Sequence, residues 1–205
     1  MAQNPFSVTM ATKKSGSIFV QSQATIGNAG SLLTGDGVPA YYEPAYSATA
    51  GLIMNPSAVT TSAGLATTYV GLCLSNPAGN TVNLVLLRAA GSFIVVTATI
   101  TMMGLITGYA AGGITVHTTA LTPFNGLIGT GAAPTAKADS ACTLVGTPLW
   151  TMSFAQAAAS STAAFNTDLA GAIIIPPGGY AAIGTSIASP ASGFQGSFEW
   201  LELPV

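Results

Sequence analysis

The sequence predicts an all-β fold, a β-sandwich or barrel, and three observations lead to it. Roughly eight to ten short runs of apolar and β-branched residues follow one another, separated by turn residues. The clearest run, residues 93–103, reads FIVVTATITMM and alternates apolar residues with threonines at the period of a strand. Helix-like composition occurs at residues 157–168, but the segment contains serine and threonine and lacks Glu and Lys, so we expect a loop there, or at most a short helix.

The first part of the chain, residues 1–40, predicts an irregular N-terminal arm ahead of a β domain at residues 41–205. Residues 17–21 can form one short strand, and glycine and other turn formers lie on both sides of it. Two interpretations stay open: an arm that reaches onto a neighbouring subunit, or a flexible terminus.

Three tyrosines, Tyr41, Tyr42 and Tyr46, lie where the arm meets the β domain. A tyrosine ring can anchor an interface while its hydroxyl stays hydrated, so we count these residues as interface candidates. The alternative is that they pack in the first strand of the sandwich.

Two strands are expected at residues 68–74 and 82–88, where apolar and β-branched residues dominate. Between them, residues 75–80 read SNPAGN. Proline fixes φ and glycine permits a positive φ, which is the chemistry of a turn. We therefore predict a β-hairpin.

The run at residues 93–103 predicts a strand whose outer face carries threonines in place of Lys or Glu. On an isolated protein such a charge-free strand would be an aggregation hazard, whereas in an assembly a neighbouring subunit would cover it. Thr97, Thr99 and Thr101 are therefore interface candidates. A loop or bend at residues 108–113 is expected to follow.

Further strands are predicted in the second half of the chain. They are residues 114–119, 141–145, 149–154, 172–175, 180–184 and 193–203. A long loop rich in Gly, Ala and Pro is expected at residues 125–140, before the strand at residues 141–145. The sequence PPGG at residues 176–179 predicts a tight turn. The last strand carries Trp200, which we add to the interface candidates.

The charge content is far below that of an ordinary domain. The chain has 4 Lys+Arg and 6 Asp+Glu in 205 residues, a charged fraction of 5%, and a mean hydropathy of +0.58, whereas about 25% is usual. Its polar surface must be built from Ser, Thr, Asn, Gln and Gly, and neutral groups cost less to desolvate than charges. Because obligate interfaces are more apolar than the general surface, we expect partners to cover much of the chain. The alternative is a monomer with a threonine-rich surface.

The same composition argues against several function classes. Four cations cannot form a basic patch for nucleic acid or a polybasic membrane anchor. The longest nearly apolar stretch, residues 102–116, is too short and too interrupted by glycine for a spanning helix. The first residues lack the basic and apolar regions of a secretory signal, so we expect synthesis and use without general secretion.

The two cysteines, Cys73 and Cys142, have no metal-ligand or CxxC spacing. Cys73 lies in an apolar strand pattern and is expected to be a buried free thiol. A disulfide between the two is the alternative.

The chain from about residue 68 to 205 resembles a known family. The resemblance rests on the turn at residues 75–80 with the strand after it, the PPGG turn before Tyr180, and the closing FEWLELPV at residues 198–205. These features resemble the jelly-roll domains of tailed-bacteriophage virion proteins, namely capsid cement or decoration proteins and head-fibre proteins. In that family a Pro-Pro-Gly turn precedes a strand near the C-terminus, and a short strand with Trp-x-Glu ends the chain.

The resemblance implies a jelly-roll-like β-sandwich that forms a homotrimer on the outer surface of a phage capsid. The major capsid protein would be its partner, and the protein would be made in the host cytoplasm. The N-terminal arm is not covered by the resemblance.

No pattern in the sequence points to catalysis, a cofactor or a metal. His117 is the one histidine, and the residues near it are threonines, so it lacks the partners of a catalytic triad. Glu199 and Glu202 are three residues apart on a predicted strand and so face opposite sides. We expect Glu199 to occupy a half-exposed edge position, with a polar contact to Arg88 or Lys137 at a subunit boundary as the alternative.

Nucleotide binding is also rejected, because the glycine-rich residues 129–134 end in proline and no strand and helix surround them.

We therefore expect a structural virion protein that binds and stabilises the outside of a capsid, without enzyme activity. The alternative is a trimeric head- or tail-fibre module that recognises a host surface glycan through residues 104–113 and 125–140. A hydrolase on a β scaffold ranks third.

Overall fold

The computed structural model describes residues 9–10, 22–23, 49–110, 117–126, 128 and 132–205. The chain divides into two compact units, Met1–Ser47 and Ala48–Val205. In the first unit, β1 (Thr9–Met10) pairs antiparallel with β2 (Ser22–Gln23). The strand expected at residues 17–21 and the three tyrosines Tyr41, Tyr42 and Tyr46 lie outside the described residues.

The second unit is a β-sandwich, as the sequence predicted. Its strands are β3 (Ala50–Met54), β4 (Thr68–Ser75), β5 (Val82–Phe93), β6 (Thr101–Tyr109), β7 (His117–Leu121), β8 (Phe124–Asn125), β9 (Lys137–Thr143), β10 (Leu149–Ala157), β11 (Ala164–Ile175), β12 (Gly179–Thr185) and β13 (Phe194–Pro204). The described residues include no helix, and hence none that could cross a membrane.

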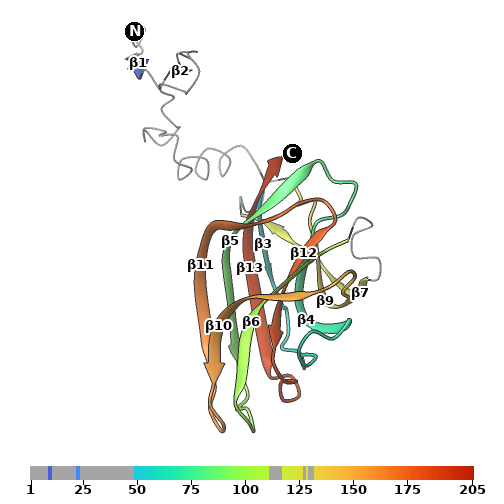
Figure 1. The fold of residues 1–205 in the computed structure, drawn as a ribbon, viewed down its shortest axis with the longest axis vertical. Coiled ribbons are helices and arrows are strands. Elements are labelled where there is room, and N and C mark those ends of the chain that lie inside the picture. Colours follow the sequence, from blue (N-terminus) through green and yellow to red (C-terminus); the bar gives the residue numbers. More distant parts are fainter. Residues whose placement is uncertain (1–8, 11–21, 24–48, 111–116, 127, 129–131) are drawn as a thin grey trace. The chain divides into compact units, whose positions relative to one another are not determined.

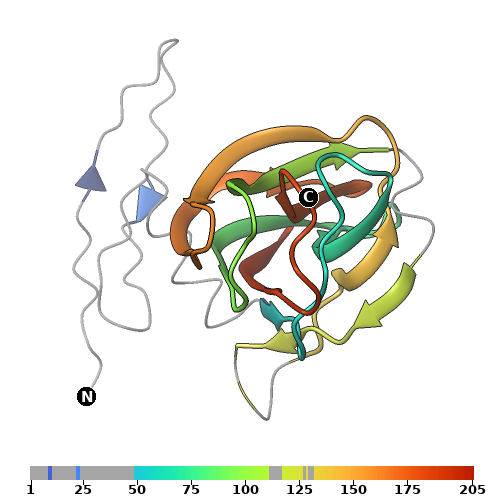
Figure 2. The same ribbon diagram turned by 90° about the horizontal axis from the view of Figure 1, so that it is seen from below.

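Two antiparallel sheets pack face to face (Figures 1 and 2). One has six strands in the order β10-β6-β12-β4-β9-β7, and the other has five in the order β11-β5-β13-β3-β8. The main core lies between them and contains Leu72, Leu86, Leu105, Phe194 and Trp200, which are fully buried.

The order in which strands pair is that of a jelly roll. Among the eight strands β3–β6 and β10–β13, the first pairs with the last, β3 with β13, and the second with the second last, β4 with β12. The series continues with β5 and β11, and ends with β6 and β10. The chain is thus folded back on itself as one long antiparallel pair that wraps into two sheets, the architecture of jelly-roll domains. Strands β7, β8 and β9 are inserted between β6 and β10 and widen both sheets at the side of β4 and β3.

A second apolar cluster covers the outer face of the six-stranded sheet. It contains Tyr69, Cys73, Ile106, Tyr180 and Ala182. Cys73 alternates along β4 with core residues and therefore points away from the main core. The segment between β9 and β10 closes over the cluster, because the Leu144 amide donates to the Thr67 carbonyl at 2.8 Å and Tyr180 Oη donates to the Val145 carbonyl at 2.9 Å. This burial explains why the central strands are apolar on both faces.

The predicted hairpin at residues 68–88 is wrong. Both strands exist, but β4 and β5 belong to opposite sheets and do not pair. The buried side chain of Asn76 fixes the course of the chain between β4 and β5, because its Nδ2 donates to the carbonyls of Val82 (2.8 Å) and Ile175 (3.0 Å). The turn at residues 75–80 therefore carries the chain from one sheet to the other.

The single strand predicted at residues 93–103 is also wrong. β5 ends at Phe93, β6 begins at Thr101, and residues 94–100 connect the two sheets. Thr99 is exposed, as expected. The burial differs from the expected one at four positions: Thr97 and Thr101 are buried, while Val96 and Ile100 are exposed. The reason is that Thr97 makes hydrogen bonds to the segment before β11, with its amide donating to the Ser161 carbonyl at 3.2 Å.

Three strands extend beyond the prediction. β11 begins at Ala164, inside the segment expected to be a loop at residues 157–168. β6 continues to Tyr109, beyond the predicted end at residue 103. Residues 104–109, expected to belong to a recognition loop, are therefore mostly strand. β9 begins at Lys137, inside the segment expected to be a loop at residues 125–140. The strands β10, β12 and β13 lie close to their predicted positions.

Candidate functional surfaces

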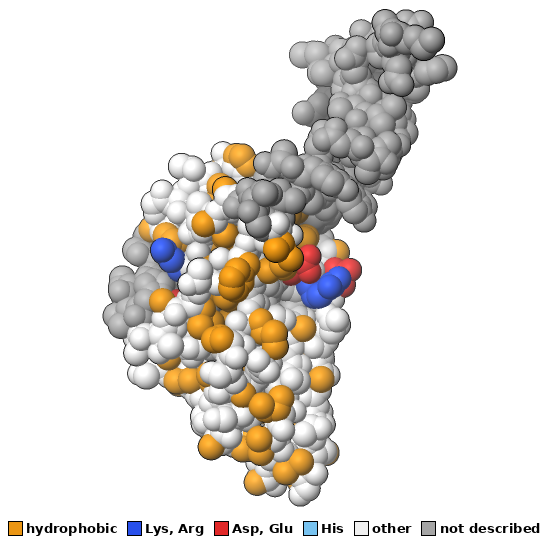
Figure 3. Space-filling view, turned by 180° about the vertical axis from the view of Figure 1, so that it is seen from behind, with side chains coloured by type: hydrophobic (Ala, Val, Ile, Leu, Met, Phe, Trp, Pro, Cys, Tyr) orange, Lys and Arg blue, Asp and Glu red, His pale blue; other side chains and the backbone are white. Residues whose placement is uncertain are grey.

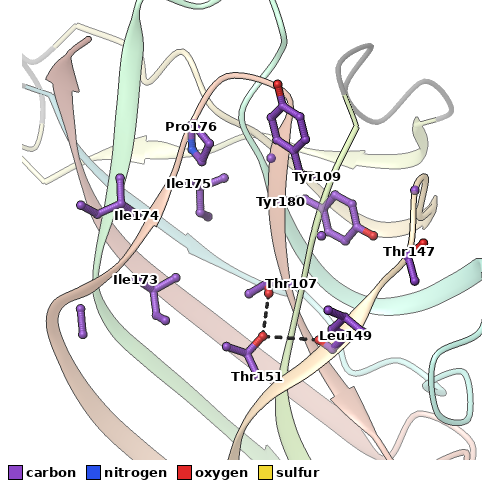
Figure 4. A pocket seen from close by; sticks show the side chains of 14 residues that line it. Thr107, Tyr109, Thr147, Leu149, Thr151, Ile173, Ile174, Ile175, Pro176 and Tyr180 are labelled. Atoms are coloured by element: carbon purple, nitrogen blue, oxygen red, sulfur yellow. Dashed lines mark hydrogen bonds between the residues drawn. The ribbon is translucent and has the colours of Figure 1, made fainter.

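A groove of about 750 Å³ opens on one side of the sandwich (Figure 4). Strands β6 and β10 form one wall, and the end of β11 forms the other. β10 and β11 are the outermost strands of their sheets, so the groove lies where the two sheets part.

One wall of the groove is aliphatic and the other is mixed. Ile173, Ile174 and Pro176 line the β11 side, and Thr107, Leu149 and Thr151 line the opposite side. The hydroxyls of Thr107 and Thr151 are 2.6 Å apart and hydrogen-bonded. None of the described lining residues is Asp, Glu, Lys, Arg or His. The groove therefore suits an uncharged occupant.

Two tyrosines close one end of the groove. Tyr180 Oη donates to the Val145 carbonyl, and burial, followed by the charges of the nearby Cys73 and Cys142 thiols, raises the pKa of Tyr180 to about 12. The phenol therefore stays neutral and remains a donor near neutral pH. Tyr109 is 58% exposed and offers its ring to an occupant.

Two glycines shape that same end. Gly178 has φ of +91° in the turn from β11 to β12, which closes with the Gly179 amide donating to the Pro176 carbonyl at 2.8 Å. Proline followed by a glycine with positive φ is the pattern of a type II turn, as the PPGG sequence predicted. Gly146 has φ of +71°, and a Cβ there would lie 2.5 Å from the Tyr109 carbonyl oxygen. Both turns can thus approach the end of β6 closely.

A second surface lies at the opposite end of β6, and we call it the tip. It consists of three connections between strands, residues 94–100, 158–163 and 186–193, which lie together at the lower end in Figure 1. Its exposed aliphatic side chains are Ile94 (53%), Val95 (39%), Val96 (54%), Ile100 (61%) and Ile187 (36%). The three connections contain no Asp, Glu, Lys, Arg or His.

Hydrogen bonds between the connections fix the shape of the tip. The Ile94 amide donates to the Gly193 carbonyl at 2.8 Å, and the Ser160 amide donates to the Thr97 carbonyl at 2.6 Å. The Thr97 hydroxyl donates to the Ala158 carbonyl at 3.2 Å. The aliphatic side chains are therefore held on an ordered backbone, which reduces the entropy lost on binding.

None of the described charged side chains belongs to the groove lining or to the tip. Arg88 and Glu199 form an ion pair at 3.6 Å between Nη1 and Oε2, on neighbouring strands β5 and β13. Glu199 therefore contacts one of the two cations considered as the alternative, but within the chain and on the central strand β13 instead of at an edge. A role of this pair at a subunit boundary stays a prediction. Figure 3 shows charged groups at two separate places, and apolar side chains extend from there down to the lower end.

Glu202 has a structural environment. It is buried, and its carboxylate accepts hydrogen bonds from the amides of Thr135 (2.8 Å) and Ala136 (3.0 Å) and from the Thr135 hydroxyl (2.9 Å). The carboxylate thereby fixes the segment that enters β9. Glu199 faces Arg88 instead, so the two glutamates do separate tasks.

Several predicted interface residues lie elsewhere than expected. Trp200 is fully buried in the main core, so its side chain is part of the packing and cannot contact a partner. Thr97 and Thr101 are also buried and bond within the chain, and Thr101 Oγ1 lies 3.2 Å from Ser186 Oγ. Thr99 is exposed and belongs to the tip. The side chain of His117 lies outside what the structure describes.

Sequence reasoning found the right segment for the tip but selected the wrong side chains. The alternation at residues 94–100 predicted that the apolar set faces inward, whereas Thr97 is the one buried residue of this segment and the apolar residues are exposed. Of the groove residues, Tyr109 lies within residues 104–113, which the sequence offered as a recognition segment. Leu149 and Ile174 were missed, because four separate strands bring the groove together and no local motif marks it. The one available signal was the absence of charge around these positions.

The cysteines are buried and free, which confirms the prediction for Cys73. Burial, a hydrogen bond with Cys142 and the nearby charge of Asp139 raise the pKa of the Cys73 thiol. Burial also raises the pKa of Tyr69, whose hydroxyl donates to the carbonyls of Leu72 and Ile183. In the described part of the chain, no group of three or more His, Cys, Asp or Glu residues is placed to hold a metal ion.

Comparison with protein-family models, curated proteins and solved structures returns no match for this chain.

Proposed function

We propose that this chain is a structural protein of a phage particle, a cement or decoration protein that binds the outside of the capsid and stabilises it. The observation that carries the proposal is the scarcity of charge, a charged fraction of 5%, together with aliphatic side chains that are exposed at the tip, a combination typical of a chain that works inside an assembly. Contiguous exposed apolar residues mark sites of interaction with other macromolecules.

The fold supports the same function. Jelly rolls recur in viral capsid and lectin domains, so the pairing order of β3–β6 with β10–β13 agrees with a virion role. This support is an analogy at the level of fold, and the surface chemistry is what favours assembly over other uses of the fold.

The mechanism is thermodynamic. A protein that binds only the assembled shell stabilises the shell in proportion to the logarithm of its free concentration over Kd, about 2.7 kcal/mol per site at a hundredfold excess over Kd. If copies associate, as the resemblance to trimeric cement proteins implies, several contacts act together and avidity rises without a new kind of contact. The major capsid protein is the expected partner.

The test begins with particles purified by density gradient from cells that produce them. The chain should be present in a fixed ratio to the major capsid protein, and stripping it should lower the temperature at which heads release DNA. Adding back the purified full chain should restore that temperature, whereas a matched amount of serum albumin should not. Absence of the chain from purified particles would refute the proposal, and localisation to a fibre or tail tip by immunogold labelling would favour a receptor-binding module instead.

A further inference from the structure

We propose that copies of this chain associate head to tail, with the tip of one copy docked in the groove of the next. The inference rests on the proposed function in one respect, because it takes the chain to act as an assembly of copies. It names the two surfaces that form the contact between them.

The two surfaces match in polarity. The tip presents Ile94, Val96 and Ile100, and the groove offers a wall formed by Ile173 and Ile174. Neither surface contains a charged side chain among its residues, so docking buries no charge and sets no like charges against each other. The outer face of the five-stranded sheet lacks this advantage, because it carries Arg88 and Glu199.

The two surfaces also match in size. A volume of about 750 Å³ is in the range of sites that enclose a whole drug-sized ligand, so it has room for several aliphatic side chains. Each tip side chain is already partly buried in its own copy. Removing the exposed part of one such side chain from water corresponds to about a tenfold change in dissociation constant.

The positions of the surfaces set the symmetry. β6 begins at Thr101 beside the tip and reaches the groove at Thr107–Tyr109, so the tip and the groove lie at opposite ends of one strand, roughly 25 Å apart. A contact between two different surfaces of the same chain is heterologous, and repetition of it gives a closed ring or an open filament.

Other occupants fit the surfaces less well. A bilayer surface is bound by side chains such as Trp, Lys and Arg, and the residues of the tip include none of them. A glycan would fill the groove through Tyr109 and the threonine hydroxyls but would leave the aliphatic tip uncovered.

The experiment uses two double variants of the full chain. The tip variant is Val96→Asp with Ile100→Asp, and the groove variant is Leu149→Asp with Ile174→Asp. All four positions are more than half exposed, at 54% to 61%, so folding should be preserved, and circular dichroism with a thermal melt checks this. Phe124→Asp is the matched control, because Phe124 is 65% exposed and lies in β8, outside both surfaces.

Sedimentation velocity across a concentration series should show oligomers for the unaltered chain and for the control. Each double variant should be monomeric, with a dissociation constant raised at least a hundredfold. An equimolar mixture of the two variants should form a one-to-one dimer and nothing larger, because it holds one intact tip and one intact groove for each pair.

Three results would overturn the inference. The first is a folded tip or groove variant that forms the same oligomers as the unaltered chain. The second is a mixture of the two variants that stays monomeric. The third is flotation of the unaltered chain, but not of the tip variant, with phosphatidylcholine vesicles. Failure of the proposed function is read separately, from the purified particles. If the variants are monomeric and still bind heads, the capsid role holds. If the unaltered chain forms head-to-tail oligomers but is absent from purified particles, the docking of tip in groove holds and the capsid role fails.

Discussion

The contact between Gly51 and Trp200 should make Gly51→Ala strongly destabilising. Gly51 lies opposite Trp200 in the pairing of β3 with β13. A Cβ at position 51 would lie 2.5 Å from Trp200 Nε1 and closer still to two carbons of the indole. Trp200 is fully buried in the main core, so its ring cannot move into solvent to make room.

The magnitude follows from two effects. Overpacking a well-packed core costs about 1–3 kcal/mol. A displaced indole also weakens the hydrogen bond of 3.4 Å from Trp200 Nε1 to Glu202, which is worth about 1 kcal/mol. We therefore expect Gly51→Ala to lower the free energy of unfolding by about 2–4 kcal/mol, or Tm by roughly 10 °C.

Urea unfolding measures this change, provided that the dependence of the free energy on urea is equal in both proteins. Gly79→Ala is the matched control, because a Cβ there meets no atom within 4 Å, and it should change stability by less than about 0.5 kcal/mol. In a Trp200→Phe background the cost of Gly51→Ala should fall by at least about 1 kcal/mol, since the smaller ring leaves room. Equal stability of Gly51→Ala and the unaltered chain would refute the packing described for this part of the core.

Three further predictions address charge and ionisation. Glu202→Gln should lower the free energy of unfolding in urea by about 2–3 kcal/mol, because the buried carboxylate accepts three hydrogen bonds from Thr135 and Ala136. Glu199→Gln at the exposed ion pair should lower it by less than about 1 kcal/mol. Equal costs would contradict the structural role of Glu202. The folded state raises the pKa of Tyr180 from 10.0 to about 12 and so holds the phenolic proton more tightly than the unfolded chain does. Stability should therefore be insensitive to this group below about pH 10 and fall between pH 10 and 12 by up to about 1.4 kcal/mol per pH unit, a slope that Tyr180→Phe should reduce. The buried thiols Cys73 and Cys142 should not react with a disulfide reagent at neutral pH until urea unfolds the chain, and rapid reaction of the native protein would show that the second apolar cluster is open.

The strands were predictable where burial of apolar side chains alone determines the structure. β4, β12 and β13 are central in their sheets, and most of their apolar residues are buried. The turn at residues 176–179 was predictable because proline and glycine determine it locally. These segments are correct because the sequence carries their cause within a few residues.

The pairing of strands was not predictable in this way. The alternation in β4 and β5 identifies two strands but does not say which strands they pair with. Their separation into opposite sheets depends on Asn76, which bonds to Ile175, a residue 99 positions away. A short connection with turn residues is equally compatible with a hairpin and with a crossing between sheets.

The candidate surfaces were less predictable than the fold, for a reason that residues 94–100 make clear. Hydrophobic transfer alone places Val96 and Ile100 inside and Thr97 outside. The structure reverses this arrangement, because Thr97 bonds to the backbone of residues 158–161, which the sequence does not bring near.

The scarcity of charge explains both the reversal at the tip and the surface that results from it. A Lys or Glu at position 97 or 101 would hold the connection open, because burying an ionised group without a partner costs far more than burying a hydroxyl. Threonine can be buried once its hydroxyl finds a carbonyl, as at Thr97, or another hydroxyl, as in the 2.6 Å contact between Thr61 and Thr185. At Thr97 the hydroxyl turns inward, while the neighbouring Val96 and Ala98 are exposed. The apolar tip is therefore a consequence of how the connections are bonded to each other. Turning the Thr97 hydroxyl out to the surface would break its hydrogen bond to Ala158 and loosen the backbone that holds the tip in shape.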